Sequence, residues 1–276
     1  MRLVKQLGAV GAVMVAGGLA VGATEGSWAP TLVLGIATAV LALLAYGWVV
    51  RRTEHREPVE VALRGVGAAA ARGAALGAAM FVVVVGVITV LGGYRVEGWG
   101  SVTAAAGLLG LAVVASVTEE VVFRGVLLRV VEERAGTVGA LVLTSVLFGA
   151  MHLLNPHATV WGAVAVAVEA GGMLGAAYAA TRTLWLPIGL HAAWNFTASG
   201  IFGTEVSGAG VASGLLDGVT SGPVLLSGGA FGPEASLPAV LAGIVLTVLF
   251  LRLAHRRGRV VTRRGRAERV ATTATV

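Results

Sequence analysis

The sequence predicts an all-α polytopic membrane protein, and three observations support this fold class. Of the 276 residues, 57% are hydrophobic and 12% are charged, about half the charged share of a soluble domain. The 41 glycines and many alanines are typical of membrane helices, in which small residues let backbones approach closely. Apolar runs of about the length that crosses a bilayer recur along the chain, and we expect about eight transmembrane helices.

The first apolar run, residues 7–23, follows the basic residues Arg2 and Lys5. It could be a signal peptide, because Val21-Gly22-Ala23 resembles a small-residue cleavage site. The run is long for a signal peptide and a second run follows at once, so we expect a retained helix. The predicted spans are residues 7–23, 30–50, 72–91, 102–122, 138–153, 159–181, 184–202 and 237–254.

Basic residues orient these helices, because cytoplasmic connections carry an excess of lysine and arginine. They follow the second, fourth, sixth and eighth spans, whereas the opposite connections contain only Arg95, so we expect both termini in the cytoplasm. Much of the formal charge of +6 lies in residues 252–269, which is typical of a basic segment beside anionic lipid. We therefore expect membrane lipid as a partner and no nucleic acid. The composition, rich in Ala, Gly, Val and Arg, predicts a bacterial cell membrane.

The chain divides into four segments. Residues 1–101 hold three helices and an inner-surface connection, 54–71, which is either a short interfacial helix or a solvated loop. Residues 102–202 hold helices four to seven and form the predicted catalytic core. Residues 203–236 are rich in Gly and Ser and predict a flexible outer loop. Residues 237–276 hold the last helix and the basic tail.

Ionisable groups lie inside the fourth predicted span, where each costs about 2.5–3.5 kcal/mol to insert, so a chain that keeps them usually uses them. Glu120 and Arg124 are four residues apart and share a helix face, which predicts a buried ion pair. Glu119 diverges from Glu120 by about 100° around the helix and is free to face a cavity. The absence of cysteine excludes disulfides, thiolate ligands and a cysteine nucleophile.

Helix geometry predicts that polar residues of three helices meet. The fourth and fifth helices form a hairpin with its apex near Gly136, and Glu120 precedes that residue by as many positions as His152 follows it. Both therefore lie about 24 Å below the tip. His191 lies about 13 Å in from the cytoplasmic side, and the levels agree if the hairpin projects about 10 Å past the bilayer. We expect a cytoplasm-facing intramembrane cavity that contains Glu119, His152, His191 and Asn195.

These side chains allow three interpretations. A carboxylate and a histidine can deprotonate water, while a second histidine and an amide stabilise an oxyanion. Alternatively, Glu119, His152 and His191 could ligate a divalent metal such as zinc and leave one position for water. The groups could also be hydrogen bonds between packed helices. A further carboxyl, Glu169 in the sixth span, is expected to be protonated and hydrogen-bonded between helices, or to contact one of the histidines.

Three motifs resemble those of a known family. Glu119-Glu120-Val-Val-Phe-Arg124 is similar to its EExxxR motif, and Phe148-Gly-Ala-Met-His152 to its FxxxH motif. The segment His191-Ala-Ala-Trp-Asn195 is similar to its HxxxN motif and follows a typical Leu184-Trp-Leu-Pro187. The chain thus resembles the CPBP (Abi) family of CAAX and bacteriocin-processing intramembrane proteases, related to type II CAAX prenyl endopeptidases.

The resemblance implies an α-helical membrane protease in which Glu119 and His152 activate water. It gives His191 and Asn195 an oxyanion or metal-site role, and Glu120 and Arg124 a supporting one. Members are usually labelled metalloproteases, and a metal-free glutamate mechanism is also described. Bacterial members of the family have bacteriocin-maturation or self-immunity roles.

We therefore predict an endopeptidase that hydrolyses a peptide bond of a membrane-associated substrate, lipidated or of bacteriocin type, from the cytoplasmic side. Two alternatives stay open. One is a non-catalytic immunity or scaffold protein that binds its partner in the same pocket. The other is a proton-coupled transporter with Glu119 and Glu169 as proton relays, although the sequence has no inverted repeat to support it.

Overall fold

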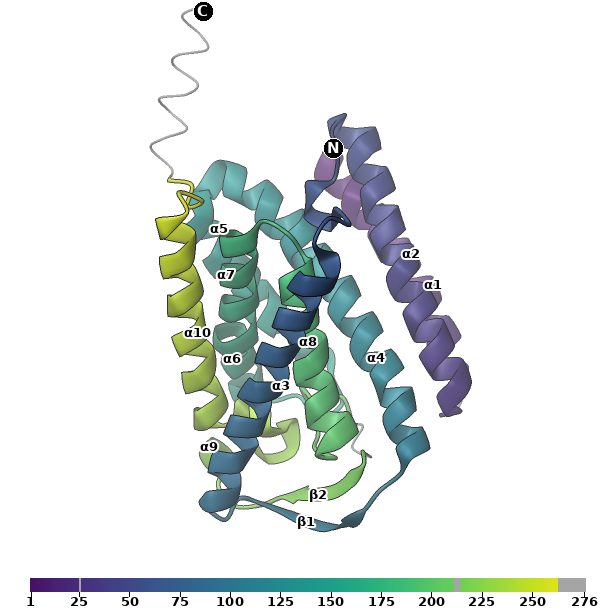
Figure 1. The fold of residues 1–276 in the computed structure, drawn as a ribbon, viewed down its shortest axis with the longest axis vertical. Helices are drawn as coiled ribbons and strands as arrows, with labels where there is room; N and C mark the ends of the chain where they lie inside the picture. Colours follow the sequence, from purple (N-terminus) through teal and green to yellow (C-terminus); the bar gives the residue numbers. More distant parts are fainter. Residues whose placement is uncertain (25, 211–213, 263–276) are drawn as a thin grey trace, which may run out of the picture.

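Long helices run side by side between two ends of the molecule in the computed structural model, which describes residues 1–24, 26–210 and 214–262 (Figure 1). Residue 1 and the end of the last helix lie at one end, called the terminal end below. A small sheet lies at the other, the far end. The chain is an integral membrane protein: six helical stretches in its described part are long and apolar enough to cross a bilayer.

The N-terminal region contains three of these stretches, α1 (Arg2–Gly22), α2 (Trp28–Glu54) and α3 (Val66–Val90). The connection between α2 and α3 contains only a 3₁₀ turn, η1 (Val59–Val61). Helix α3 begins six residues before the predicted span because the alanine-rich sequence that precedes Arg72 favours helix as strongly as the apolar run itself.

The middle of the chain forms one helical stretch of 53 residues, Val102–Leu154. It consists of α4 (Val102–Glu120), the π-helical segment η2 (Val121–Leu128), α5 (Arg129–Met151) and the 3₁₀ turn η3 (His152–Leu154). Non-helical dihedral angles at Gly136, with φ 74° and ψ 171°, interrupt α5 where the hairpin apex is predicted. A positive φ is a conformation that glycine adopts without steric cost.

Three further helices complete the bundle. The first is one continuous helix that consists of α6 (Val160–Val166), the π-helical η4 (Ala167–Gly171) and α7 (Gly172–Thr181). Next come α8 (Trp185–Asn195) with the π-helical η5 (Phe196–Ile201), and then α10 (Leu237–Arg256). The stretch from α8 to η5 matches the seventh predicted span but is not among the six long apolar stretches, so the number of eight spans stays a prediction.

The described parts of the segment 203–236, residues 203–210 and 214–236, form more regular structure than the flexible loop that the sequence predicts. Strand β2 (Leu216–Thr220) pairs antiparallel with β1 (Tyr94–Trp99). The short elements α9 (Val224–Ser227), η6 (Gly229–Phe231) and η7 (Pro233–Ala235) follow. Phe231 and Glu234 are buried, which a pattern of Gly and Ser did not indicate. Burial also raises the pKa of Tyr94 to about 12, and its hydroxyl donates to the Phe202 carbonyl at 2.8 Å.

Small residues bring the core helices together. A Cβ atom at Gly171 would lie 2.9 Å from Ser145 Cα, and one at Gly175 would lie 2.4 Å from Leu141 Cδ1. Both contacts are with α5, so these glycines let the sixth and fifth predicted helices pack at a distance that a larger side chain prevents.

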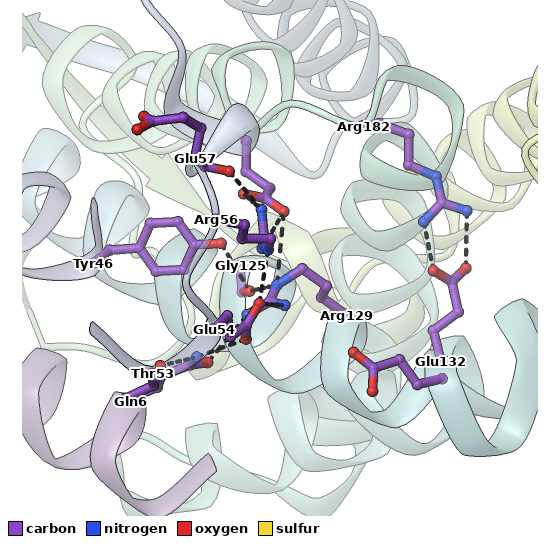
Figure 2. Close-up of polar contacts among 12 residues, drawn as sticks. Gln6, Tyr46, Thr53, Glu54, Arg56, Glu57, Gly125, Arg129, Glu132 and Arg182 are labelled. Atoms are coloured by element: carbon purple, nitrogen blue, oxygen red, sulfur yellow. Dashed lines mark hydrogen bonds and ion pairs between the residues drawn. The ribbon is translucent and has the colours of Figure 1, made fainter. Parts of the chain in front are cut away.

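A network of charged side chains joins the N-terminal helices to the core at the terminal end (Figure 2). Arg129 of α5 donates to both oxygens of Glu54, at 2.8 and 2.7 Å, and Gln6 of α1 donates to the same carboxylate at 2.7 Å. Arg56 donates to Glu54 at 2.7 Å and to Glu60 at 2.9 Å. Burial lowers the pKa of Arg56, but these two carboxylates outweigh it and raise the pKa above its ordinary value.

The first residues of the predicted basic tail fold back onto the bundle. Arg257 and Arg259 donate to the Ala180 carbonyl near the end of α7, at 3.0 and 2.5 Å. Cationic side chains at this position satisfy carbonyls that a helix end leaves unpaired. Residues 263–276, the rest of the predicted tail, lie outside the described residues.

Candidate active site

Glu120 is paired inside the bundle, as its spacing from Arg124 predicts. Arg124 Nη1 donates to Glu120 Oε1 at 2.7 Å, and His191 Nδ1 donates to the same oxygen at 3.0 Å. Glu120 is completely buried and Arg124 nearly so, which requires that each charge has a partner. Arg124 Nη2 also donates to the carbonyls of Ala170 and Gly171, so it ties η2 to the sixth predicted helix.

Glu119 lies in a different environment from its neighbour. Its side chain is 17% exposed, and its Oε2 lies 3.8 Å from His191 Nε2, which is too long for a direct hydrogen bond. Among the residues that the structure describes, this oxygen has no hydrogen-bond partner. The helical spacing thus separates the two carboxylates as predicted. Glu120 is paired with Arg124, whereas Glu119 lies beside the His191 ring.

The depth argument placed Glu119 at the level of His152, but in the structure the histidine nitrogen beside it is His191 Nε2, at 3.8 Å. Counting residues from the apex at Gly136 gives the level of a side chain in the membrane. It does not give the rotation of each helix about its own axis, which packing decides. Residue counting can therefore give the depth of a side chain, but it cannot give the side chain that it faces on the next helix.

His152 follows directly from the end of α5. Its Nδ1 lies 2.8 Å from the Phe148 carbonyl, an acceptor, so Nδ1 carries the proton and Nε2 is a free acceptor in the neutral ring. The Phe148 ring lies 4.9 Å from the His152 ring and 6.1 Å from the His191 ring. The Arg124 guanidinium lies 4.6 Å above the same ring. Phe148 thus supports residues of all three motifs.

Three of the predicted catalytic residues, His152, His191 and Asn195, line one small cavity of about 10 Å³. This is about the space of one water molecule. Glu119 is not part of the cavity wall and lies on the Nε2 side of His191. His191 therefore connects the predicted base to the cavity that holds the other two groups.

Two residues of this cavity come from the segment that the sequence assigns to an outer loop. Glu234 accepts hydrogen bonds from Trp194 Nε1 at 2.8 Å and from Ser207 Oγ at 2.5 Å. Ser207 and Glu234 both line the cavity, so residues of the far-end segment form part of its wall. The prediction of a cytoplasm-facing cavity did not include this wall. No periodic pattern around Glu234 could have indicated its position, because the Gly- and Ser-rich segment folds by tertiary contacts.

Glu169 also lines the cavity, and it differs from the expectation of a hydrogen bond between helices. It is completely buried, and neither carboxyl oxygen has a hydrogen-bond partner in the described part of the chain. The expectation came from the high cost of leaving a buried polar group unpaired.

The predicted metal ligands Glu119, His152 and His191 do not form a cluster of three. In residues 1–24, 26–210 and 214–262, no group of three or more His, Asp or Glu side chains is placed to hold a metal ion. A catalytic zinc site takes three protein ligands. The arrangement described here does not fit such a site, the metal stays a prediction, and no step below depends on it.

A comparison with protein families matches residues 100–197 to the type II CAAX prenyl endopeptidase Rce1-like family. These residues are an Rce1-like CAAX protease domain. The match contains all three motifs in full: Glu119 to Arg124, Phe148 to His152, and His191 to Asn195. Searches of curated proteins and of solved structures found no match to the chain. The match to residues 100–197 supports a CAAX-type intramembrane protease at the level of the family.

Proposed function

We propose that this Rce1-like domain hydrolyses a peptide bond of a membrane-associated substrate, with Glu119 as the base that activates water. The observation that carries the proposal is the different pairing of two adjacent carboxylates. Arg124 and His191 both donate to Oε1 of Glu120, whose Oε2 has no partner, whereas Glu119 accepts no hydrogen bond from any cationic side chain among the described residues and lies 3.8 Å from His191 Nε2. A carboxylate that is not paired with an arginine can accept a proton from water without first breaking a buried ion pair.

The position of Glu119 suits this step. Glu119 Oε2 and His191 Nε2 are 3.8 Å apart, close enough for one water molecule to hydrogen-bond both. Water gives a proton to the Glu119 carboxylate, and its oxygen forms a bond with the carbonyl carbon of the substrate. We propose that His152, with Nε2 free as an acceptor, assists in activating the water.

Negative charge then develops on the substrate carbonyl oxygen. We assign its stabilisation to His191 and Asn195, which line the same cavity. In its protonated form His191 donates from Nε2, and the Asn195 amide is a second donor. Removal of one such donor costs about 10²–10³-fold in kcat in enzymes that use an oxyanion hole.

The test is cleavage by the purified chain in liposomes. Two peptides of the same sequence are compared: one ends in a prenylated Cys-aliphatic-aliphatic-X box, and the other is attached to an unmodified transmembrane helix. Mass spectrometry identifies any new C-terminus. We expect the wild type to cleave at least one peptide and His152→Ala to cleave neither.

A matched control is Thr144→Val, since Thr144 is buried in α5 and its hydroxyl bonds only carbonyls of its own helix. This variant should cleave at the rate of the wild type. Cleavage by His152→Ala at the wild-type rate would contradict the proposal. So would a wild-type chain, folded in liposomes, that cleaves neither these peptides nor the membrane proteins of a bacterial extract.

A further inference from the structure

Glu169 is a buried carboxyl that takes no part in the proposed activation of water or in the stabilisation of the oxyanion. It has no exposed surface, and in the described chain neither of its oxygens accepts or donates a hydrogen bond. Ionised and without donors, a carboxylate in such a place would cost several kcal/mol. A chain that only needed to pack here would do so with an apolar residue at lower cost. The position therefore indicates a chemical use.

The surroundings of Glu169 are those of the proposed active site. It lines the cavity that His152, His191 and Asn195 also line. On the α10 side, a Cβ atom at Gly243 would lie 2.6 Å from Glu169 Cα, so this helix packs directly against the Glu169 backbone. The Glu169 side chain is thus confined between α10 and the cavity.

No arginine or lysine among the described residues forms an ion pair with Glu169. Arg124 donates to the neighbouring carbonyls of Ala170 and Gly171 and to Glu120, and makes no hydrogen bond to the Glu169 carboxyl. Glu234 of η7 lines the same cavity but is itself an acid, and both its oxygens already accept hydrogen bonds. The remaining titratable groups of the cavity are His152 on η3 and His191 on α8.

The local backbone gives a second, independent indication. Three π-helical segments occur in the described chain, and π-bulges are frequent at functional sites. η2 begins directly after Glu120, and η5 begins directly after Asn195, so two of them adjoin motif residues. The third, η4, contains Glu169. Glu169 thus lies in the same kind of helix distortion as the motif residues, although it belongs to none of the three motifs.

We propose that Glu169 is the general acid of the site, a neutral carboxylic acid that protonates the amine that leaves. This inference rests on the proposed function. When the tetrahedral intermediate collapses, its C–N bond breaks and the nitrogen takes the proton of the Glu169 carboxyl. The proton that Glu119 took from water then restores the acid form of Glu169 by way of His191, which lies beside Glu119 and lines the cavity with Glu169. The net reaction consumes one water molecule and gives an acid and an amine.

The main test is Glu169→Gln, which keeps the size of the side chain and removes the acid. In liposomes, with the peptide that the wild type cleaves, we expect kcat to fall by about 10²–10⁴-fold and KM to change little. The wild-type rate should fall at alkaline pH as Glu169 loses its proton, and this alkaline limb should be absent in Glu169→Gln. Glu169→Asp, which keeps an acid, should recover the limb.

An infrared difference spectrum gives a measurement that needs no activity. Wild type should show the C=O stretch of a neutral carboxylic acid, and Glu169→Gln should lack it. If no peptide is cleaved, the proposed function fails while this band still reports on Glu169. The inference is overturned if the band is missing, or if Glu169→Gln cleaves at the wild-type rate with an unchanged pH profile. Folded Glu169→Asp that lacks the alkaline limb would also overturn it.

Discussion

Two clusters of buried carboxylates lie in the same bundle, and they differ in how completely they are paired. At the terminal end, Glu54 accepts hydrogen bonds from Arg129, Arg56 and Gln6, as Figure 2 shows. Around the proposed site, Glu119, Glu120 and Glu169 each have a carboxyl oxygen without a partner in the described residues, but only Glu120 is bonded by an arginine. The difference indicates that carboxylates paired with arginine hold the bundle together, whereas the two carboxylates without an arginine are the candidates for chemistry.

The paired cluster has a structural explanation. Glu54 ends α2, Gln6 belongs to α1 and Arg129 begins α5, so the network fastens the N-terminal helices to the Rce1-like domain. Arg129 Nε also donates to the Gly125 carbonyl at 2.9 Å, and the Tyr46 hydroxyl donates to the same carbonyl at 3.1 Å. These bonds satisfy a carbonyl of the π-helical segment η2.

The largest expected effect on stability is that of Arg129→Ala. The change removes two hydrogen bonds to Glu54 and leaves it with those from Arg56 and Gln6, and breaking a buried pair by removal of one partner costs about 3–5 kcal/mol. The free energy of unfolding, measured by steric trapping in bicelles or by denaturant, should fall by this amount. A loss below about 1 kcal/mol would show that the network is not structural and would break the comparison.

A smaller effect is expected from Phe148→Leu, which keeps an apolar side chain but removes the ring beside both histidines and under Arg124. We expect kcat to fall about tenfold, or about 1.4 kcal/mol, because the histidines lose their fixed orientation. Wild-type kcat in this variant would mean that Phe148 does not position the histidines. Val240→Leu in α10, in the same apolar cluster, is the packing control.

The smallest effect is expected from removal of metal. A bound metal would supply the partner that Glu119 lacks, and the contrast between the two clusters would disappear. We expect cleavage by purified protein to continue after treatment with a strong chelator, and metal analysis to find less than one equivalent. Loss of cleavage that zinc restores would instead support the predicted ligands Glu119, His152 and His191.

The sequence predicted what depends on regular helix geometry. The pairing of Glu120 with Arg124 follows from their four-residue spacing, and the break at Gly136 follows from the apolar pattern on either side. Packing decided the rest. The rotation that sets Glu119 against His191 and the insertion of Glu234 into the cavity wall both depend on contacts between distant segments. No local pattern records such contacts.

The most direct test of the central claim compares two neighbours, Glu119→Gln and Glu120→Gln, in the same liposomes. For Glu119→Gln we expect cleavage to fall by about 10²–10⁴-fold while the free energy of unfolding stays near that of wild type. For Glu120→Gln we expect a loss of about 3–5 kcal/mol in the free energy of unfolding, because Arg124 loses its buried partner. Wild-type cleavage by Glu119→Gln, or equal destabilisation by the two changes, would contradict the account.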